Sequence, residues 1–347
     1  MNRSNLLCFL VFLFFSVTDV SAQDIHFSQY DNNSLFLNPG LTGMYNGDHR
    51  VKLSYRDQWS NILRGDAYRT GALSYDTKLD LNDLSLIGLG IVSSYDESGE
   101  LDFGTGQTAI AASYIKQFSK DTCNSHFLSF GLNLGISQRK IDLSNARWPS
   151  QHDGNGGFDP TIPPPTINDT EFLHGDVSIG LVWQSVFNCR SSFTIGMAMH
   201  HVNKPVISFL GTDDITLNMR STIHARGVIA FDNNMSLMPS VLYMKQGEHK
   251  QYIVGSSFGL APQNAGQFSS VQFGYFRRIT PELDFGLEAS SNIFLLECRI
   301  NKTDIGLSYD YSTNDLIVNG VAAKAVEFHV SFFFDKSKRR ARGFAQL

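Results

Sequence analysis

One short pattern in the sequence could support covalent catalysis. The segment GSSFG at 255–259 matches the G-x-S-x-G pattern of a serine nucleophile elbow. That chemistry needs Ser257 at a strand-to-helix turn, next to a general base. Here the pattern lies inside a segment that alternates apolar and polar residues, which predicts a strand, so we expect no catalytic residue. The histidines that could supply a base are interpreted as hydrogen-bonding groups instead: His200, His201, His224 and His329.

A second group of residues resembles a cation site. Asp153, Asn155 and Asp159 have the odd spacing of calcium ligands. A calcium loop of the EF-hand type needs a bidentate glutamate at its twelfth position, which Pro164 occupies here. A tight turn closed by the aspartate and asparagine side chains is the better interpretation. Because the sequence also lacks a C-x-x-C pair, we expect no metal and no cofactor.

The chain begins with a predicted export signal. Arg3 is followed by an apolar run at 6–15 and by a small-residue cleavage site, Val20-Ser21-Ala22. This predicts a signal peptide over residues 1–22, cut before Gln23. No later stretch approaches the roughly 18 apolar residues of a spanning helix, but an exported chain can still cross a membrane as a closed β-barrel. The net charge of −5 argues against nucleic acid as a partner.

Residues 127–139 show the pattern that predicts the fold. Apolar residues alternate with small or polar ones over more than a strand's usual length of about 5–6 residues, as in a strand that crosses a bilayer. Similar segments follow one another between 49 and 335, and we predict an all-β, antiparallel transmembrane barrel of about 14 strands, closed by the C-terminal strand. The predicted strands are 49–59, 68–79, 84–95, 104–118, 126–140, 172–185, 190–203, 217–231, 234–246, 250–261, 268–278, 283–299, 303–313 and 324–334.

The segments outside the barrel and the connections set an orientation. Residues 23–48 lack periodicity and are predicted to form an irregular periplasmic or lumenal segment, and 336–347 form a basic tail. The odd-numbered connections include the long segments 141–171, 204–216 and 314–323, whereas the even-numbered ones are mostly short. Outer-membrane barrels have long external loops and short periplasmic turns. This places both termini in the periplasm. A soluble β-sandwich would also alternate, but the strand lengths disfavour it.

Charged residues within the predicted strands should face the lumen, because a charge on the lipid side costs about 2–4 kcal/mol near the midplane. They could form a paired network that closes the lumen or line an aqueous path, and the sequence leaves both open. The set comprises Arg56, Asp57, Arg139, Asp176, Arg226 and Glu288.

Three cysteines remain after the predicted cleavage, which excludes a complete disulfide framework. Cys123 and Cys189 both lie in predicted periplasmic turns, where oxidising conditions allow a disulfide. The distance between the turns is not set by the sequence, so this pairing is left open. Cys298 is expected to be unpaired.

The connection at 141–171 is the candidate interaction loop, because loops longer than about 12–15 residues usually have a role. Two alternatives remain: the loop binds a partner, or it folds inward and narrows the lumen. Its candidate contact residues are Trp148, Gln151, Asp153, Phe158, Asp159 and Pro160.

The chain also resembles a known family. The stretch QDIHFSQYDNNSLFLNPGLTGMYNGDHRVKLSYRDQW, together with QHDGNGGFDP, HHVNKP, PSVLY and LSYDYST further on, is similar to the PorP/SprF outer-membrane proteins of the type IX secretion system. The residues that carry the resemblance are Asn38, Pro39, Arg56, Gln58, Trp59, Pro239, Tyr309, Asp310 and Tyr311. The basic tail beyond Phe334 departs from the usual end of a barrel.

The resemblance implies a non-enzymatic component of type IX secretion or gliding in the outer membrane of a Gram-negative bacterium. Implied partners are a secreted or surface protein with a C-terminal sorting domain, other secretion components and outer-membrane lipid. A channel or transporter for small solutes is the alternative, and an outer-membrane hydrolase is a remote third hypothesis.

Overall fold

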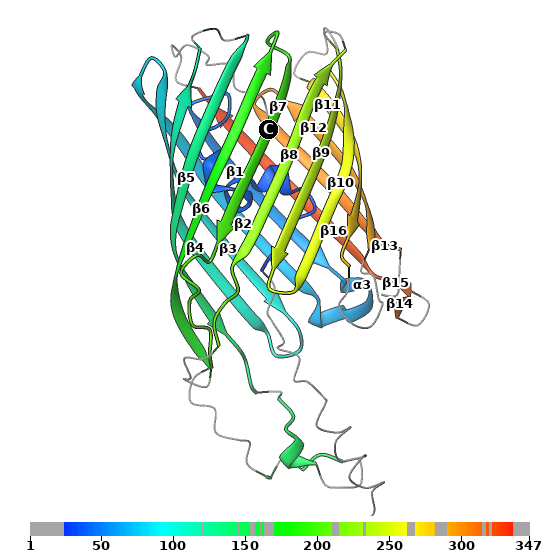
Figure 1. The fold of residues 1–347 in the computed structure, drawn as a ribbon. Helices are drawn as coiled ribbons and strands as arrows, with labels where there is room; N and C mark the ends of the chain where they lie inside the picture. Colours follow the sequence, from blue (N-terminus) through cyan, green and yellow to red (C-terminus); the bar gives the residue numbers. More distant parts are fainter. Residues whose placement is uncertain are drawn as a thin grey trace, which may run out of the picture.

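The computed structural model describes residues 24–119, 121, 123–144, 146–152, 157–159, 161–162, 170–209, 215–231, 234–261, 268–281, 290–313, 317–318 and 321–335. The predicted signal peptide and the basic tail lie outside the described residues. The chain forms a closed antiparallel barrel of 14 strands in which β1 pairs with both β2 and β16 (Figure 1). No helix in the described part of the chain is long and apolar enough to cross a membrane.

The strands of the barrel follow the sequence order around the wall. They are β1 (His49–Gln58), β2 (Tyr68–Asn82), β3 (Ser85–Ser98), β4 (Phe103–Gln117), β5 (Ser125–Lys140), β6 (Glu171–Phe187), β7 (Ser191–His200), β8 (Arg220–Ala230), β9 (Met235–Gln246), β10 (His249–Leu260), β11 (Phe268–Ile279), β12 (Ser291–Ile300), β13 (Thr303–Ser312) and β16 (Lys324–Phe334). Two short strands, β14 (Ile317–Val318) and β15 (Val321–Ala322), pair only with each other.

The predicted fold is therefore confirmed, and the predicted strand bounds agree to within three residues except at one strand. The segment predicted at 283–299 contains β12, which begins only at Ser291, and residues 282–289 lie outside the described part. The alternation along β5 is as predicted. Phe130 and Leu134 are more than half exposed on the outer face, whereas Ser129 and Asn133 are buried in the lumen.

The two ends of the barrel differ. One end, here called the loop end, carries α3 (Ser60–Leu63), η3 (Arg64–Asp66), η4 (Pro149–Gln151) and the β14–β15 pair (Figure 1). The opposite end, called the turn end, carries the short β2–β3, β6–β7 and β12–β13 connections. This is the asymmetry that the connection lengths predicted.

The N-terminal segment lies inside the barrel, and residues 24–48 are called the plug from here on. It contains η1 (Tyr30–Asn33), the one-turn α2 (Ser34–Leu37) and η2 (Pro39–Leu41), which Figure 1 shows in blue within the wall of strands. Of the two predicted locations, periplasmic or lumenal, the structure selects the lumen.

The plug runs along the lumen between the two ends. The Asp24 N–H donates to Gln246 Oε1 at 3.0 Å, beside the loop end of β9, whereas the Asp48 N–H donates to the Phe334 carbonyl oxygen at 2.9 Å at the turn end. Asp24 therefore lies in the lumen near the loop end, at the opposite end of the barrel from Phe334, and the predicted periplasmic side of the two termini stays a prediction. The aperiodic sequence of the segment gave no signal of this path.

The apolar core of the molecule lies between the plug and the inner wall. Leu41 and Met44 of the plug pack with Leu86, Ile115 and Phe127, all of which are almost fully buried. These wall residues belong to β3, β4 and β5 near the turn end. Burial of such side chains contributes about 1.5–3 kcal/mol each, so the plug is part of the fold.

Candidate functional site

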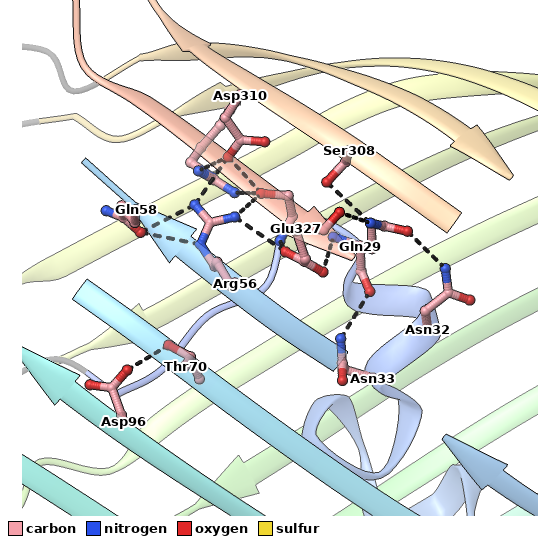
Figure 2. Close-up of polar contacts among 12 residues, drawn as sticks. Gln29, Asn32, Asn33, Arg56, Gln58, Thr70, Asp96, Ser308, Asp310 and Glu327 are labelled. Atoms are coloured by element: carbon pink, nitrogen blue, oxygen red, sulfur yellow. Dashed lines mark hydrogen bonds and ion pairs between the residues drawn. The ribbon is translucent and has the colours of Figure 1, made fainter. Parts of the chain in front are cut away.

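The most densely bonded part of the lumen surrounds Ser28 of the plug. Arg56 on β1 contacts Asp310 Oδ2 at 3.0 Å and Glu327 Oε2 at 3.2 Å, and all three side chains are almost completely buried. The Ser28 hydroxyl donates to Asp310 Oδ2 at 2.6 Å, and the Ser28 N–H donates to Glu327 Oε2 at 2.7 Å. Figure 2 shows Arg56 reaching from its strand toward both carboxylates.

Further donors complete this network. Arg278 Nη1 contacts Asp310 Oδ2 at 2.8 Å, and Arg278 Nη2 donates to the Ser28 hydroxyl at 2.6 Å. The Gln29 N–H donates to Glu327 Oε1 at 3.1 Å, and Gln58 Oε1 accepts from the Arg56 guanidinium. Because buried charges are tolerated only when paired and hydrogen-bonded, the plug segment at Ser28 helps to satisfy the charges of the wall.

A second polar group holds the start of the plug at the loop end. The two ring nitrogens of His201 lie 2.5 Å from Asp24 Oδ2 and 2.7 Å from Asp176 Oδ1, and Arg220 Nη1 lies 3.2 Å from Asp24 Oδ2. An imidazole that meets a carboxylate at each nitrogen acts as a double donor, which is the protonated form. This group joins the plug to β6, β8 and the residue after β7.

The other histidines singled out in the sequence also contact the plug. His200 Nε2 lies 3.3 Å from the Leu37 carbonyl oxygen, and His224 Nε2 accepts from the Asn38 amide at 3.2 Å. His329 Nδ1 accepts from the Asn32 amide at 3.3 Å. The interpretation of these residues as lumenal hydrogen-bonding groups is confirmed.

The Asn38-Pro39-Gly40 turn of the plug rests on the wall by close backbone contact. The Asn38 amide donates to the carbonyl oxygens of Leu181 and Met197, on β6 and β7, at 3.2 and 3.1 Å. Asn38 Oδ1 accepts from the Gly40 N–H at 2.8 Å and closes the start of η2. One asparagine thus fixes both the turn and its place on the wall.

Four lumenal glycines make this approach possible and are called the glycine track: Gly88, Gly131, Gly180 and Gly196, on β3, β5, β6 and β7. A Cβ on Gly131 would lie 2.2 Å from the Pro39 carbonyl carbon, and one on Gly180 would lie 1.9 Å from Asn38 Oδ1. A Cβ on Gly88 would lie 2.3 Å from the Thr42 carbonyl oxygen. Backbone can approach backbone this closely only where no side chain intervenes.

Toward the turn end, the plug meets a third set of charges. Arg50 and Asp76, both about 1% exposed, form an ion pair at 2.8 Å, and the Gly43 N–H donates to Asp76 at 2.8 Å. The Arg50 guanidinium also lies 4.4 Å from the centre of the Tyr45 ring. The plug is therefore anchored along its whole length.

Two cavities of the lumen lie on opposite sides of the plug. The loop-end cavity has a volume of about 510 Å³ and is lined by Arg56, Arg139, Asp96 and other residues of that end. The turn-end cavity has a volume of about 640 Å³ and is lined by residues that include Arg226 and Glu297. The two linings share no described residue, because the Ser28 network and the glycine track lie between them.

The residues that carry the family resemblance separate into four places. Arg56, Gln58 and Asp310 meet in the Ser28 network, and Asn38 and Pro39 lie on the glycine track. Trp59 follows β1 at the loop end, with its ring edge-on to Tyr68 at 5.2 Å. The others are exposed on the outer face: Pro239, Tyr309 and Tyr311.

The prediction that strand charges face the lumen holds for Arg56, Arg139, Asp176 and Arg226. It is wrong for Asp57, which follows Arg56 and therefore projects from the opposite face. Asp57 lies 3.7 Å from the exposed Arg69 on β2. Glu288 lies outside the described residues.

The described part of the 141–171 loop has a small structure of its own. The Gln151 amide donates to the Ile162 carbonyl oxygen at 2.8 Å, and its Oε1 accepts from the Trp148 N–H at 3.1 Å. Phe158 is 41% exposed. Hydrogen bonds from the Thr161 hydroxyl and N–H lower the pKa of Asp159.

The described part of this loop does not narrow the lumen. Figure 1 shows η4 beyond the loop end, away from the barrel wall, so the inward-folding hypothesis is wrong for the described residues. The segment that fills the lumen is the plug. Asp153, Asn155 and Pro160 lie outside the described residues.

The cysteines and the serine pattern also have defined places. Cys123 and Cys189 form a disulfide at the turn end that joins the β4–β5 and β6–β7 connections, and Cys298 is free. Ser257 is buried within β10. The whole GSSFG pattern at 255–259 lies inside this strand and not at a strand-to-helix turn. Among the described residues no group of His, Cys, Asp and Glu side chains is arranged to hold a metal.

Sequence reasoning missed Ser28, Asp24, Arg278 and the glycine track as lumenal contacts. Their partners are far away in the chain, since Ser28 and Glu327 are separated by 299 positions. One signal was available: glycines recurred on the polar face of several neighbouring strands, where a narrow lumen would need them.

Fold and lumen together define a class: an outer-membrane β-barrel whose lumen is filled by its own N-terminal segment. The chain belongs to the PorP/SprF family of type IX secretion system membrane proteins, whose family model matches residues 19–332.

No curated protein matches the sequence. Solved structures of other barrels are similar at low identity. A Pseudomonas aeruginosa FadL homologue has a TM-score of 0.48 and 12% identity, over 87% of this chain and 94% of that chain. A mutant of the monoaromatic hydrocarbon channel TodX has a TM-score of 0.47 and 12% identity over 86% and 93%. CdiB from Acinetobacter baumannii has a TM-score of 0.46 and 6% identity over 82% and 60%.

Proposed function

We propose that this protein is a non-enzymatic component of the type IX secretion or gliding machinery, which assists the export or surface attachment of a partner with a C-terminal sorting domain. Family membership supports the secretion context. The observation that carries the proposal is the plug, because a lumen held closed by buried ion pairs and backbone contacts favours binding at the ends of the barrel over passage through it.

The loop end is the proposed surface for the exported partner. It carries the longest connection, and the aromatic side chains Trp148 and Phe158 lie on a loop whose described part extends beyond the barrel. Aromatic residues commonly anchor protein interfaces. In the proposed orientation the loop end faces the cell exterior, and the turn end, with Phe334, faces the periplasm and other secretion components.

A deletion tests the loop. Affinity capture of the tagged barrel from outer membranes should recover a surface protein with a sorting domain, and removal of residues 145–168 should reduce that recovery about tenfold, as loss of a hot-spot contact does. The matched control shortens the other long connection at 207–215. Equal recovery from the wild type and the 145–168 deletion would remove this loop from the proposal.

The alternative function is a channel for small solutes, and the two lumenal cavities are the observation that favours it. Planar-bilayer recording separates the two functions. The secretion proposal expects no stable conductance from the wild type, with a variant that lacks residues 24–44 as the conducting control. Large, stable, solute-selective currents through the wild type would favour the channel.

A further inference from the structure

One row of lumenal side chains is only half covered by the plug. The strand registers place Glu327, Arg56, Thr70, Asp96, Thr105 and Arg139 side by side on β16, β1, β2, β3, β4 and β5. Ser28 and Gln29 of the plug bond the Glu327 and Arg56 half of this row. The other half, from Asp96 to Arg139, lines the loop-end cavity.

Arg139 is the unpartnered cation of this half. Its side chain is about 6% exposed, its Nε is buried without a hydrogen-bond partner, and it forms no ion pair with any described residue. A buried guanidinium is normally held by carboxylates or carbonyl oxygens, because an unsatisfied buried charge costs several kcal/mol. Arg139 therefore has an unused donor and lines a cavity of about 510 Å³.

The neighbouring carboxylates are engaged elsewhere. Asp96 accepts a hydrogen bond from the Thr70 hydroxyl at 2.5 Å, as Figure 2 shows, and the intervening strand β4 separates it from Arg139 by about 10 Å. Asp24 and Asp176 are both held by His201. Asp24 of the plug attracts the Arg139 guanidinium from a distance, but no described carboxylate forms an ion pair with it.

We propose that the loop-end cavity is a binding site for a ligand carrying a carboxylate, which Arg139 receives. The guanidinium fork matches two carboxylate oxygens, and such charge-assisted bonds are among the strongest available to a protein. Thr105 and Gln107 supply polar side chains beside it, and the Trp59 and Tyr68 rings supply apolar surface in the same cavity. The carboxylate belongs either to the chain end of a peptide or to a small organic acid.

The test is calorimetric titration of the full-length barrel in detergent micelles with three probes. They are N-acetyl-Gly-Phe with a free carboxylate, the same peptide as its C-terminal amide, and 3-phenylpropionate. We expect the free-acid peptide to bind at least about tenfold more tightly than its amide, the effect of one charge-assisted contact. Binding of 3-phenylpropionate with the same dependence on Arg139 assigns the source to small acids, and binding of the peptide alone assigns it to chain ends.

Three variants attribute the effect to Arg139. Arg139→Gln should abolish the preference for the free acid, whereas Arg139→Lys should retain part of it. Lys140→Gln is the matched control, because Lys140 is the next residue, carries the same charge and is exposed on the opposite face. Folding of each variant is checked by the heat-dependent gel mobility of the closed barrel.

The proposal fails on any of three results. Acid and amide bind the wild type equally, Lys140→Gln loses as much affinity as Arg139→Gln, or none of the three probes binds at about 10 mM, beyond the weak end of ordinary affinities. Equal binding of acid and amide, and absence of binding by all three probes, are both measured on the wild type alone. None of them depends on the secretion machinery, so they are independent of the loop-deletion experiment.

Discussion

The two halves of the plug are held in different ways. Around Ser28, directional hydrogen bonds and ion pairs join the plug to Arg56, Asp310 and Glu327. Around Pro39, the plug has few charges and lies against bare backbone at the glycine track. Water can replace much of the first kind of contact if the plug moves, whereas the second kind depends on shape and fails when one side chain is added. The contacts around Ser28 determine where on the wall the plug binds. The contacts around Pro39 determine how closely the plug packs against the wall.

The largest effect is expected at the glycine track. Gly131→Leu would introduce a side chain whose Cβ alone lies 2.2 Å from the Pro39 carbonyl carbon. Overpacking of this kind costs about 1–3 kcal/mol or more, and the rigid wall cannot yield, so the plug should be displaced. Planar-bilayer recording should then show step conductances that the wild type lacks.

Gly71→Leu is the matched control for that experiment, because the ideal Cβ at Gly71 has no atom within 4 Å. It should behave as the wild type does. A silent Gly131→Leu barrel would show that the plug tolerates displacement from the track and that the charge network alone closes the lumen.

An intermediate effect is expected in the charge network. Glu327→Gln removes one carboxylate from Arg56 and weakens the bonds from the Ser28 and Gln29 N–H groups. Because Arg56 keeps Asp310, the loss should be about 1.5–3 kcal/mol in the free energy of unfolding, the range for a hydrogen bond to a charged group. Urea denaturation in detergent, followed by tryptophan fluorescence, measures it. An unchanged midpoint would mean that the Ser28 half contributes little to holding the plug.

The smallest effect is expected outside the lumen. Asp57→Asn removes a half-exposed ion pair with Arg69, whose nitrogen lies 3.7 Å away. Exposed pairs contribute about 0–1 kcal/mol, so the same denaturation experiment should show almost no shift. A loss as large as that of Glu327→Gln would contradict the distinction between lumenal and outer charges.

The sequence was sufficient to predict the barrel, because apolar and polar residues alternate along each strand that crosses a membrane. Phe130 and Leu134 against Ser129 and Asn133 could be assigned to opposite faces without knowing their neighbours. The same argument placed Arg56 in the lumen. It was misapplied at Asp57, since two consecutive strand residues cannot share a face.

The plug could not be predicted in the same way. Its 3₁₀ turns are short and its sequence has no regular hydrophobic period. The pattern of the plug therefore does not show which of its residues contact the wall. Its position follows from contacts such as that of Asn38 with Leu181 and Met197, about 150 positions away. Such contacts exist only once the barrel has closed.

The path of the plug has a consequence for any group joined to the chain. Asp24 lies near the loop end, whereas His49 and Phe334 lie together at the turn end. A fluorophore attached at Asp24 would therefore lie near the mouth that carries the long loops. One attached after Asp335 would emerge at the opposite mouth. Labels at Asp24 and Asp335 would report from opposite ends of the barrel.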